Sequence, residues 1–219
     1  IFPNQLGNED LRWETARVID ASLEFGLWED RVSGKVEAYH KLAKDVLLQV
    51  GVSPSTGFSS YWDNVAEVVN RGLEFSIQTI NISTKDFTWI TNFNMARNYN
   101  ELNNIGGYTP DAVSGGTNDS RVVPGKPVGS FYLVPFSHID DESGRPVYID
   151  ADGNNTFDYD FVNDRQYVGD GLPDFIGGMT NTVTYKQWTV SALLNFSKGA
   201  KIFDSSAKRQ MGVVTGWNM

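Results

Sequence analysis

Three short polar turns in this sequence each lie between bulky aromatic residues, and a much longer polar stretch follows each of the hairpins that they close. The turns are Leu27–Arg31, Ile82–Asp86 and Tyr185–Gln187. The long stretches cover about residues 41–64, 98–174 and 198–219. Short turns on one side of a sheet, long loops on the other and aromatic residues at the short-turn edge are typical of a β-barrel that spans a membrane.

Aromatic side chains lie at the edges of all three turns. Tyr and Trp rings have an apolar body and a polar tip, and they are enriched where a bilayer meets water. We therefore expect six residues to anchor the turns at the membrane interface: Phe25, Trp28, Phe87, Trp89, Tyr185 and Trp188.

Alternation of apolar and polar residues predicts about six antiparallel strands in three hairpins, over about residues 15–41, 68–99 and 175–197. The clearest strand surrounds Leu194 and Phe196, which flank the polar Asn195. The expected lengths approach or exceed the ~9–11 residues of a tilted membrane-crossing strand. Residues 46–52 either extend the second strand or form a separate one, and both alternatives stay open.

The polar faces of these strands carry charged and amide side chains. Such groups are costly in a packed core unless they are paired, whereas the water-filled or plugged lumen of a barrel accepts them. Leu73 and Leu194 are expected to face lipid, and Ser76 and Asn195 to face the lumen. We expect the lumen wall to include Glu24, Glu37, Glu74, Gln78 and Asn94.

Composition excludes several other classes of protein. The net charge of −9 leaves no basic stripe for nucleic-acid phosphates. With no cysteine among 219 residues, neither a disulfide framework nor a thiolate metal site can form. No apolar run reaches the ~18 residues that indicate a membrane-spanning helix, but barrel strands are apolar only at alternate positions and need no such run.

Six strands are too few to close a transmembrane barrel, because the smallest examples have ~8. Residues 1–11 show no basic segment followed by an apolar one, and residues 207–219 lack the apolar–aromatic pattern of a closing strand. We therefore expect an all-β fold: a segment of about six antiparallel strands from a large transmembrane β-barrel, with long extracellular loops. On this interpretation a plug, an N-terminal extension and the closing strand lie outside residues 1–219.

The long loops contain aromatic side chains that can stack on sugar rings or clamp a peptide. The candidates for contact with substrate or a partner are Tyr61, Trp62, Tyr108, Phe131, Tyr132 and Tyr159, with Phe157 and Trp217 in the same loops. For any single residue, we favour packing among the loops or contact with a partner protein over contact with substrate. The apolar run of residues 129–136 is expected to pack on the barrel rim.

An acidic segment in the longest loop has the spacing of a calcium-binding loop. Asp150, Asp152, Asn154, Thr156 and Asp158 alternate, and hard oxygen ligands at alternate positions suit Ca²⁺. Asn155 and Phe161, however, stand where such loops have Gly and Glu. The alternative, which we favour, is an Asp/Gly/Asn turn that hydrogen-bonds to its own backbone. No other cofactor is expected.

Catalytic patterns are missing from the sequence. His40 and His138 are isolated, and Asp140, Asp141 and Glu142 are expected to be a solvated loop. The sequence contains no nucleophile elbow, zinc-protease helix motif, phosphate-binding loop or dinucleotide fingerprint. We therefore do not expect an enzyme.

Five segments resemble the SusC/RagA family of TonB-linked outer-membrane proteins. They are Asn8–Leu48, Thr56–Thr79, Pro124–Tyr132, Asp150–Asp160 and Leu172–Asp204. The segments follow the family's order and cover nearly the whole chain.

The resemblance implies an outer-membrane barrel of about 22 strands with a plugged lumen, from Bacteroidetes-type bacteria. It implies uptake of oligosaccharides or peptides, powered by TonB through parts outside this sequence, with a SusD-like surface lipoprotein as a lid. Whether two barrels pair stays open. The alternative is a soluble, secreted β-sandwich that binds carbohydrate, because such a module shares the alternation and the loop aromatics.

Overall fold

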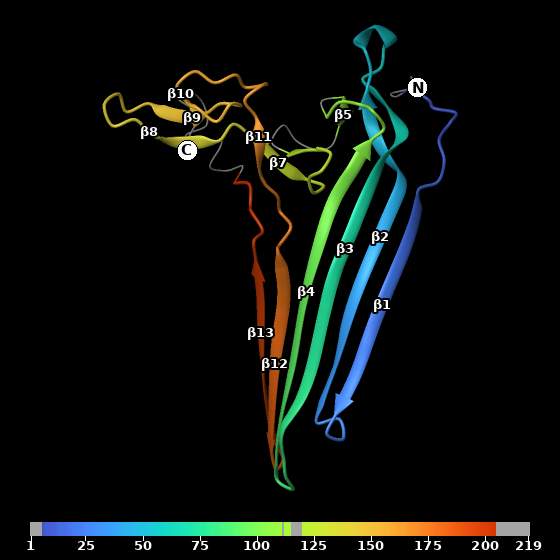
Figure 1. The fold of residues 1–219 in the computed structure, drawn as a ribbon, viewed down its shortest axis with the longest axis vertical. Helices are drawn as coiled ribbons and strands as arrows, with labels where there is room; N and C mark the ends of the chain where they lie inside the picture. Colours follow the sequence, from blue (N-terminus) through green and yellow to red (C-terminus); the bar gives the residue numbers. More distant parts are fainter. Residues whose placement is uncertain (1–5, 111, 115–119, 205–219) are drawn as a thin grey trace.

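Six long strands form one antiparallel sheet that stands as a tall wall (Figure 1). The computed structural model describes residues 6–110, 112–114 and 120–204. The order of the long strands is β1-β2-β3-β4-β12-β13, with the short β5 attached to β2. Their bounds are β1 Thr15–Leu27, β2 Val32–Gly51, β3 Ser60–Ser83, β4 Phe87–Ile105, β12 Phe175–Tyr185 and β13 Trp188–Lys198. The predicted strands thus form three hairpins in a single sheet.

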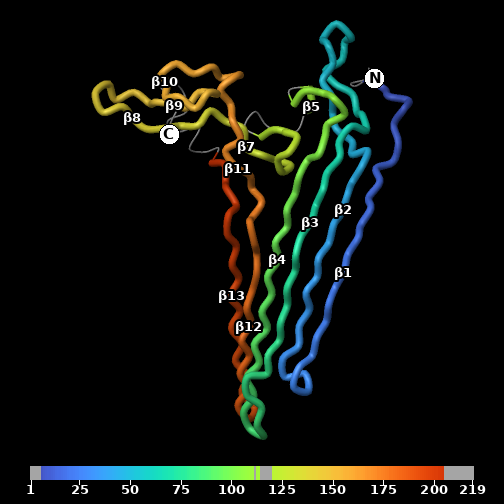
Figure 2. Tube along the Cα trace, in the orientation of Figure 1, coloured from blue at the N-terminus to red at the C-terminus, as the bar shows by residue number. Residues whose placement is uncertain are grey.

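The three short turns lie together at one end of the wall, and the longer connections lie at the other (Figure 2). We call these the turn end and the loop end. The β1–β2 turn places three consecutive non-glycine residues, Trp28, Glu29 and Asp30, at positive φ. Such backbone is uncommon outside glycine, and Asp and Asn adopt it more readily than other residues.

The predicted long loop over residues 41–64 is wrong, because most of it is strand. β2 continues to Gly51 and β3 begins at Ser60, so only a short connection with the 3-10 turn Pro54–Thr56 (η1) remains. Two register shifts between Ala43 and Leu47 interrupt the pairing of β2 with β3. A β-bulge inserts an extra residue and disturbs the alternation of faces, so the strand pattern is lost at that point.

The longest connection leaves β4 at Ile105, which is later than predicted, and returns at Phe175. Its described residues form seven short strands: β5 Val113–Ser114, β6 Ser120–Arg121, β7 Ser130–Leu133, β8 Phe136–Ile139, β9 Pro146–Ile149, β10 Asn155–Thr156 and β11 Gln166–Gly169. Strands β11-β7-β6 and β10-β9-β8 form two small sheets. The β8–β10 sheet projects sideways from the loop end as an arm (Figure 1).

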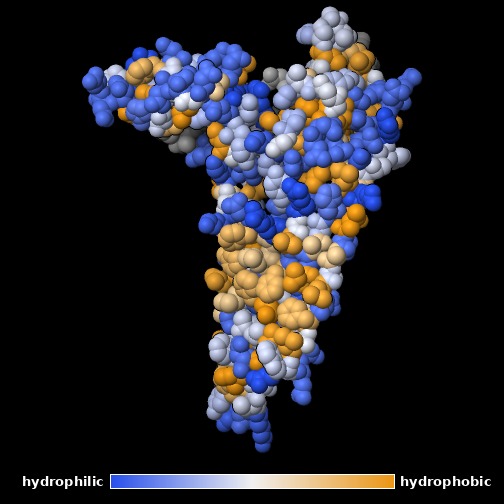
Figure 3. All heavy atoms as spheres, viewed as in Figure 1, coloured by the Kyte–Doolittle hydropathy of each residue, from blue (hydrophilic) through white to orange (hydrophobic). Residues whose placement is uncertain are grey.

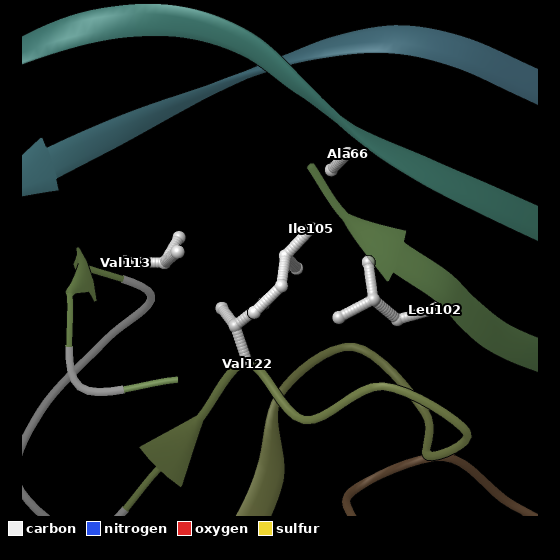
Figure 4. Packing of buried hydrophobic residues seen from close by; sticks show 5 residues of the cluster. All are labelled: Ala66, Leu102, Ile105, Val113 and Val122. Carbon is white, nitrogen blue, oxygen red and sulfur yellow. The ribbon is translucent and has the colours of Figure 1, made fainter. Parts of the chain in front are cut away.

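Buried apolar side chains are concentrated at the loop end. Ala66, Leu102, Ile105, Val113 and Val122 point toward one another (Figure 4) and are each at most 4% exposed. Along the wall, by contrast, apolar side chains form an exposed band on the stem, with mostly hydrophilic side chains above it (Figure 3). So large an exposed apolar surface is typical of a face that lipid or a partner covers.

The alternative of a β-sandwich is wrong. The long strands belong to one sheet rather than two packed sheets, and neighbouring residues on opposite faces of β13 are both exposed, Leu193 at 66% and Leu194 at 57%. Among the described residues, no helix is long and apolar enough to cross a membrane.

Candidate functional site

One face of the wall is apolar across all six long strands because the strand register aligns their apolar residues. A row near the middle of the band contains Phe25, Gly34, Ile77, Phe93, Met179 and Leu194. The next row toward the loop end contains Leu23, Val36, Phe75, Met95, Gly177 and Phe196. We call this surface the apolar face.

Aromatic rings cover two glycines of the apolar face. A β-carbon on Gly34 would lie 2.7 Å from the ring of Phe25, and one on Gly177 would lie 2.5 Å from the ring of Phe196. The neighbouring strand's ring thus fills the space that a side chain would take.

The opposite surface, the polar face, carries the residues predicted for a lumen wall. One of its rows contains Glu24, Lys35, Ser76, Asn94, Gly178 and Asn195. In the next row, Glu37 lies directly opposite Glu74, and Lys35 forms an ion pair with Glu37. Lys35 thus offsets part of the repulsion that two opposed carboxylates would otherwise produce.

The six predicted interface aromatics lie toward the turn end. Trp28 and Trp188 are 72% and 73% exposed, and Phe87 pairs with Tyr185, which in turn pairs with Trp188. Phe25, however, lies three rows deeper than Phe87 and Tyr185, in the middle of the apolar band. Contact of these rings with a membrane interface stays a prediction.

A polar network crosses the apolar face between the turn-end aromatics and the row that contains Phe25. The indole N–H of Trp89 donates to Asn181 Oδ1 at 3.0 Å, and the hydroxyl of Thr91 donates to the same oxygen at 2.7 Å. Asn81 Nδ2 donates to Thr91 at 2.7 Å, and Thr79 donates to Asn81 at 2.9 Å. Each polar side chain in the network therefore has a partner, which a position facing lipid requires.

At the other edge of the apolar face lie residues that the sequence analysis did not single out. Tyr99 and Arg71 pair across β3 and β4, and the guanidinium carbon of Arg71 lies 4.6 Å from the centre of the Tyr99 ring. Tyr99 lies ten residue steps along β4 from Trp89. At ~3.3 Å per residue and a tilt of about 40°, this separation spans about 25 Å, the height of a barrel's apolar band.

Tyr61 and Tyr108, two predicted contact residues, bind each other instead of pointing into solvent. Their hydroxyl oxygens lie 2.7 Å apart, and Tyr108 donates to Asp63 Oδ2 at 3.0 Å. The hydrogen bond with Tyr61, burial and the hydrogen bond with Asp63 together raise the pKa of Tyr108 above its usual value. The cluster fastens the start of the long connection to β3.

The other predicted contact aromatics do not form one site with this pair. Phe131 and Tyr132 are half-buried in β7 of the small sheet, where the guanidinium carbon of Arg121 lies 5.5 Å from the centre of the Tyr132 ring. Tyr159 packs against Tyr148 of the arm in a tilted arrangement, with ring centres 4.4 Å apart. Trp62 and Phe157 are 39% and 40% exposed, and Trp217 lies outside the described residues.

The segment predicted for calcium forms a tight turn between β9 and β10. Asp150 Oδ1 accepts hydrogen bonds from the backbone N–H groups of Asp152 at 3.0 Å and Asn154 at 2.7 Å. Gly153 has a φ of +84°, and its N–H donates to the carbonyl oxygen of Asp150 at 3.1 Å. These contacts form the self-bonded turn that was the favoured alternative. Across the described ranges, no three His, Cys, Asp or Glu side chains converge as metal ligands. Calcium binding through these residues stays a prediction.

Asp140 forms a second turn of this kind in the arm. Its Oδ2 accepts from both the hydroxyl, at 2.5 Å, and the N–H, at 2.8 Å, of Ser143. These hydrogen bonds hold the pKa of Asp140 below its usual value. His138 pairs with the Ser137 hydroxyl at 2.9 Å, whereas His40 lies exposed on the apolar face.

β4 and β12 separate above their last pair, Ala96 with Ile176. The turn before β7 takes the edge that β12 leaves, because Leu102 donates to Lys126 at 3.0 Å and accepts from Gly125 at 2.8 Å. A cleft of about 560 Å³ lies where the strands diverge. Its lining includes Arg97, Asn98, Lys126, Tyr167, Asp170 and Lys201.

Comparison with known proteins identifies the family. A family model described as "TonB dependent receptor-like, beta-barrel" matches residues 1–209. TonB-dependent receptor SusC of Bacteroides thetaiotaomicron is 30% identical over 222 residues, which cover 95% of this chain and 22% of SusC. TonB-dependent receptor P26 of Formosa agariphila is 30% identical over 216 residues, 90% of this chain and 21% of that protein.

Solved structures share the fold. The RagAB peptide transporter matches with a TM-score of 0.74 and 24% identity over 87% of this chain and 22% of that one. The "open-open" state of the RagAB peptide importer matches with a TM-score of 0.76 and 22% identity over 89% of this chain and 21% of that one. The chain therefore spans about a fifth of the length of its relatives. The predicted fold class and the resemblance are confirmed, and the chain belongs to the TonB-dependent receptors of the SusC/RagA family, as a segment of their β-barrel.

Proposed function

We propose that the complete protein is an outer-membrane importer of oligosaccharides or peptides, energised by TonB, and that the wall described here is part of its barrel. The observation that carries the proposal is the register. Over the middle of the wall it places mainly apolar side chains on one face, and most carboxylate, amide and hydroxyl side chains on the other, across the six long strands. Lipid contact on one side and passage of a hydrophilic cargo on the other require this separation.

In this mechanism the wall has a passive role. The polar face offers carboxylates, amides and hydroxyls, among them Glu74, Ser76 and Asn94, to water, cargo or a plug. TonB coupling is assigned to other parts of the complete protein. We propose no catalytic step for this chain, and the matched family consists of receptors.

We further propose that a SusD-like lipoprotein covers the loop end. The arm and the segment after it expose apolar side chains that the chain itself does not bury. The exposed fractions are 56% for Phe136, 52% for Ile139, 60% for Phe161 and 61% for Val162. Exposed apolar patches with polar surroundings commonly mark protein-interaction surfaces, and the arm projects away from the wall, where a second protein can reach it (Figure 1).

The geometry of the loops reduces the number of aromatic residues that can contact cargo. The hydroxyls of Tyr61 and Tyr108 are hydrogen-bonded within the cluster that includes Asp63, so these two residues hold the loop in place. Trp62 and Tyr159 keep exposed ring surface, 39% each, and are the better candidates for stacking on a sugar ring or packing on a peptide.

The test is uptake by cells that carry or lack the complete gene. We expect loss of the gene to abolish entry of either labelled oligosaccharides or labelled peptides, and collapse of the proton-motive force to have the same effect. Unchanged uptake of both cargo classes, or recovery of the protein from the aqueous rather than the membrane fraction, would refute the proposal. For the lid, we expect Phe136→Ser with Ile139→Ser to reduce copurification of the lipoprotein without changing the barrel's heat-modifiable migration in electrophoresis.

A further inference from the structure

Two arginines interrupt the apolar face at its edge nearest the loop end. One row contains Ala21, Ala38, Leu73 and Arg97, and the next contains Ile19, His40, Arg71 and Tyr99. Both rows belong to the apolar face, because they continue the same alternation along each strand as Phe75 and Met95. These two rows carry no carboxylate.

The two guanidinium groups are available for a ligand. Arg71 and Arg97 are exposed, and within the described part of the chain neither forms an ion pair. The guanidinium of Arg71 lies over the ring of Tyr99. A shallow cavity of about 350 Å³ is lined by Arg71, Leu73, Arg97 and Tyr99 of the apolar face, together with Tyr39 and Gly72, which occupy polar-face positions in the register.

The strand pairing places this cavity at the boundary of the hydrocarbon layer. β4 is paired with β12 up to Ala96, and the pairing ends one residue before Arg97. Hydrocarbon does not tolerate unpaired backbone, so the apolar layer ends near Ala96. The span of about 25 Å from Trp89 to Tyr99 gives the same boundary. The arginines therefore lie at headgroup level.

We propose that Arg71, Arg97 and Tyr99 bind the phosphate of an outer-leaflet lipid headgroup, whose acyl chains then run down the apolar face beside Leu73 and Phe75. Guanidinium groups recognise phosphate through charge-assisted and often bidentate hydrogen bonds. The apolar row directly below the cavity favours a phosphate that carries acyl chains over free phosphate. The inference rests on the proposed membrane location of the complete protein.

The experiment uses the complete protein in neutral detergent micelles, with bound lipid measured by native mass spectrometry. The probes are diphosphorylated lipid A and the same lipid after enzymatic removal of its phosphates. We expect a preference of at least tenfold for the phosphorylated form, and loss of that preference in R71Q/R97Q. The matched control K85Q/K186Q removes the same charge at the turn end and should keep the preference.

Several results would overturn the proposal. They are equal retention of the two lipids, full retention by R71Q/R97Q, or complete displacement of lipid by millimolar inorganic phosphate, which would indicate a site for the anion alone. Heat-modifiable migration shows whether each variant is folded. If R71Q/R97Q does not fold, R71K/R97K supplies the test, because lysine keeps the charge and should retain a reduced preference. Uptake is measured separately, so a failed importer and a failed lipid site remain distinguishable.

Discussion

The hydroxyl of Tyr39 on β2 donates a hydrogen bond to the side-chain oxygen of Asn98 on β4, 2.8 Å away, across the intervening strand β3. The bond can span three strands because Gly72 lies beneath the ring. A β-carbon at Gly72 would lie 2.6 Å from the Tyr39 hydroxyl and 2.5 Å from the carbonyl oxygen of Arg97.

Gly72→Val should therefore displace the Tyr39 ring and strain the β3–β4 pairing. We expect a loss of about 1–3 kcal/mol in the free energy of unfolding, the range for overpacked sites. Tyr39→Phe keeps the ring and removes the hydrogen bond, so its cost should be only about 0.5–1.5 kcal/mol. Denaturant unfolding of the complete protein measures both, and an equal cost for the two variants would contradict the steric argument.

The stability cost of an arginine substitution should depend on how deep the residue lies in the membrane and on which face of the wall it occupies. Leu194→Arg lies in the middle row of the apolar face and should cost ~2–4 kcal/mol. Leu73→Arg lies beside Arg97 at the edge, so we expect only ~0–1 kcal/mol. Asn195→Arg and Ser76→Arg on the polar face are the matched controls and should be mild. Equal costs on both faces would contradict the membrane-facing assignment.

Trp89 and Asn181 should be energetically coupled. Asn181→Ala leaves the indole N–H of Trp89 without its acceptor, whereas Trp89→Phe removes the donor. We expect a coupling of about 0.5–1.5 kcal/mol in a double-mutant cycle. Additive effects of the two substitutions would show that the network contributes nothing measurable to stability.

Alkaline pH should loosen the loop end. Burial and the hydrogen bond to Asp170 raise the pKa of Tyr167 to about 12, from a usual value of 10.0. Because the raised pKa favours the neutral phenol in the folded state, the stabilisation is fully present below pH 10 and is lost as pH rises from 10 toward 12. Hydrogen exchange of the loop-end amides should increase over this interval in the wild type, and less so in Tyr167→Phe.

Removal of divalent cations tests the acidic turn. If Asp150 serves only its own backbone, a chelator should leave the melting temperature of the complete protein unchanged. Asp150→Ala should still increase proteolysis at the arm, because the N–H groups of Asp152 and Asn154 lose their acceptor. A chelator effect that calcium reverses and magnesium does not would instead establish the predicted metal site.

Uninterrupted alternation explains which strands were predicted well. In β13, Trp188–Lys198, the alternation around Leu194 and Phe196 is unbroken, and the hairpin expected over about residues 175–197 stops one residue short of its end. The upper parts of β3 and β4 were missed where a bulge disturbs the period, between Glu67 and Val68 of β3. For residues 46–52 of β2, above the register shift after Ala43, the extension of the strand was one of two alternatives left open. The small sheets were not predicted because their strands have only two to four residues, too few to show a period.

The functional surfaces were predictable only where a local rule applies. The alternation of faces along one strand was enough to assign Glu74 to the polar face, and the same alternation places Arg71 on the apolar face. A charge on an apolar face breaks the pattern, however, and its meaning depends on Tyr99, a neighbour on the next strand. The contact of Tyr108 with Asp63 joins residues 45 apart, and no spacing rule connects them.

The pairing of β4 with β12 has a consequence for how such a receptor can diversify. The strands are joined without a register shift from Phe87 and Tyr185 at the turn end to Ala96 and Ile176. The connection between Ile105 and Phe175 therefore leaves and rejoins a sheet whose register is already fixed on both sides. Insertions, deletions and exchanged sequences in that connection can reshape what the cell surface presents, while the membrane wall keeps its register.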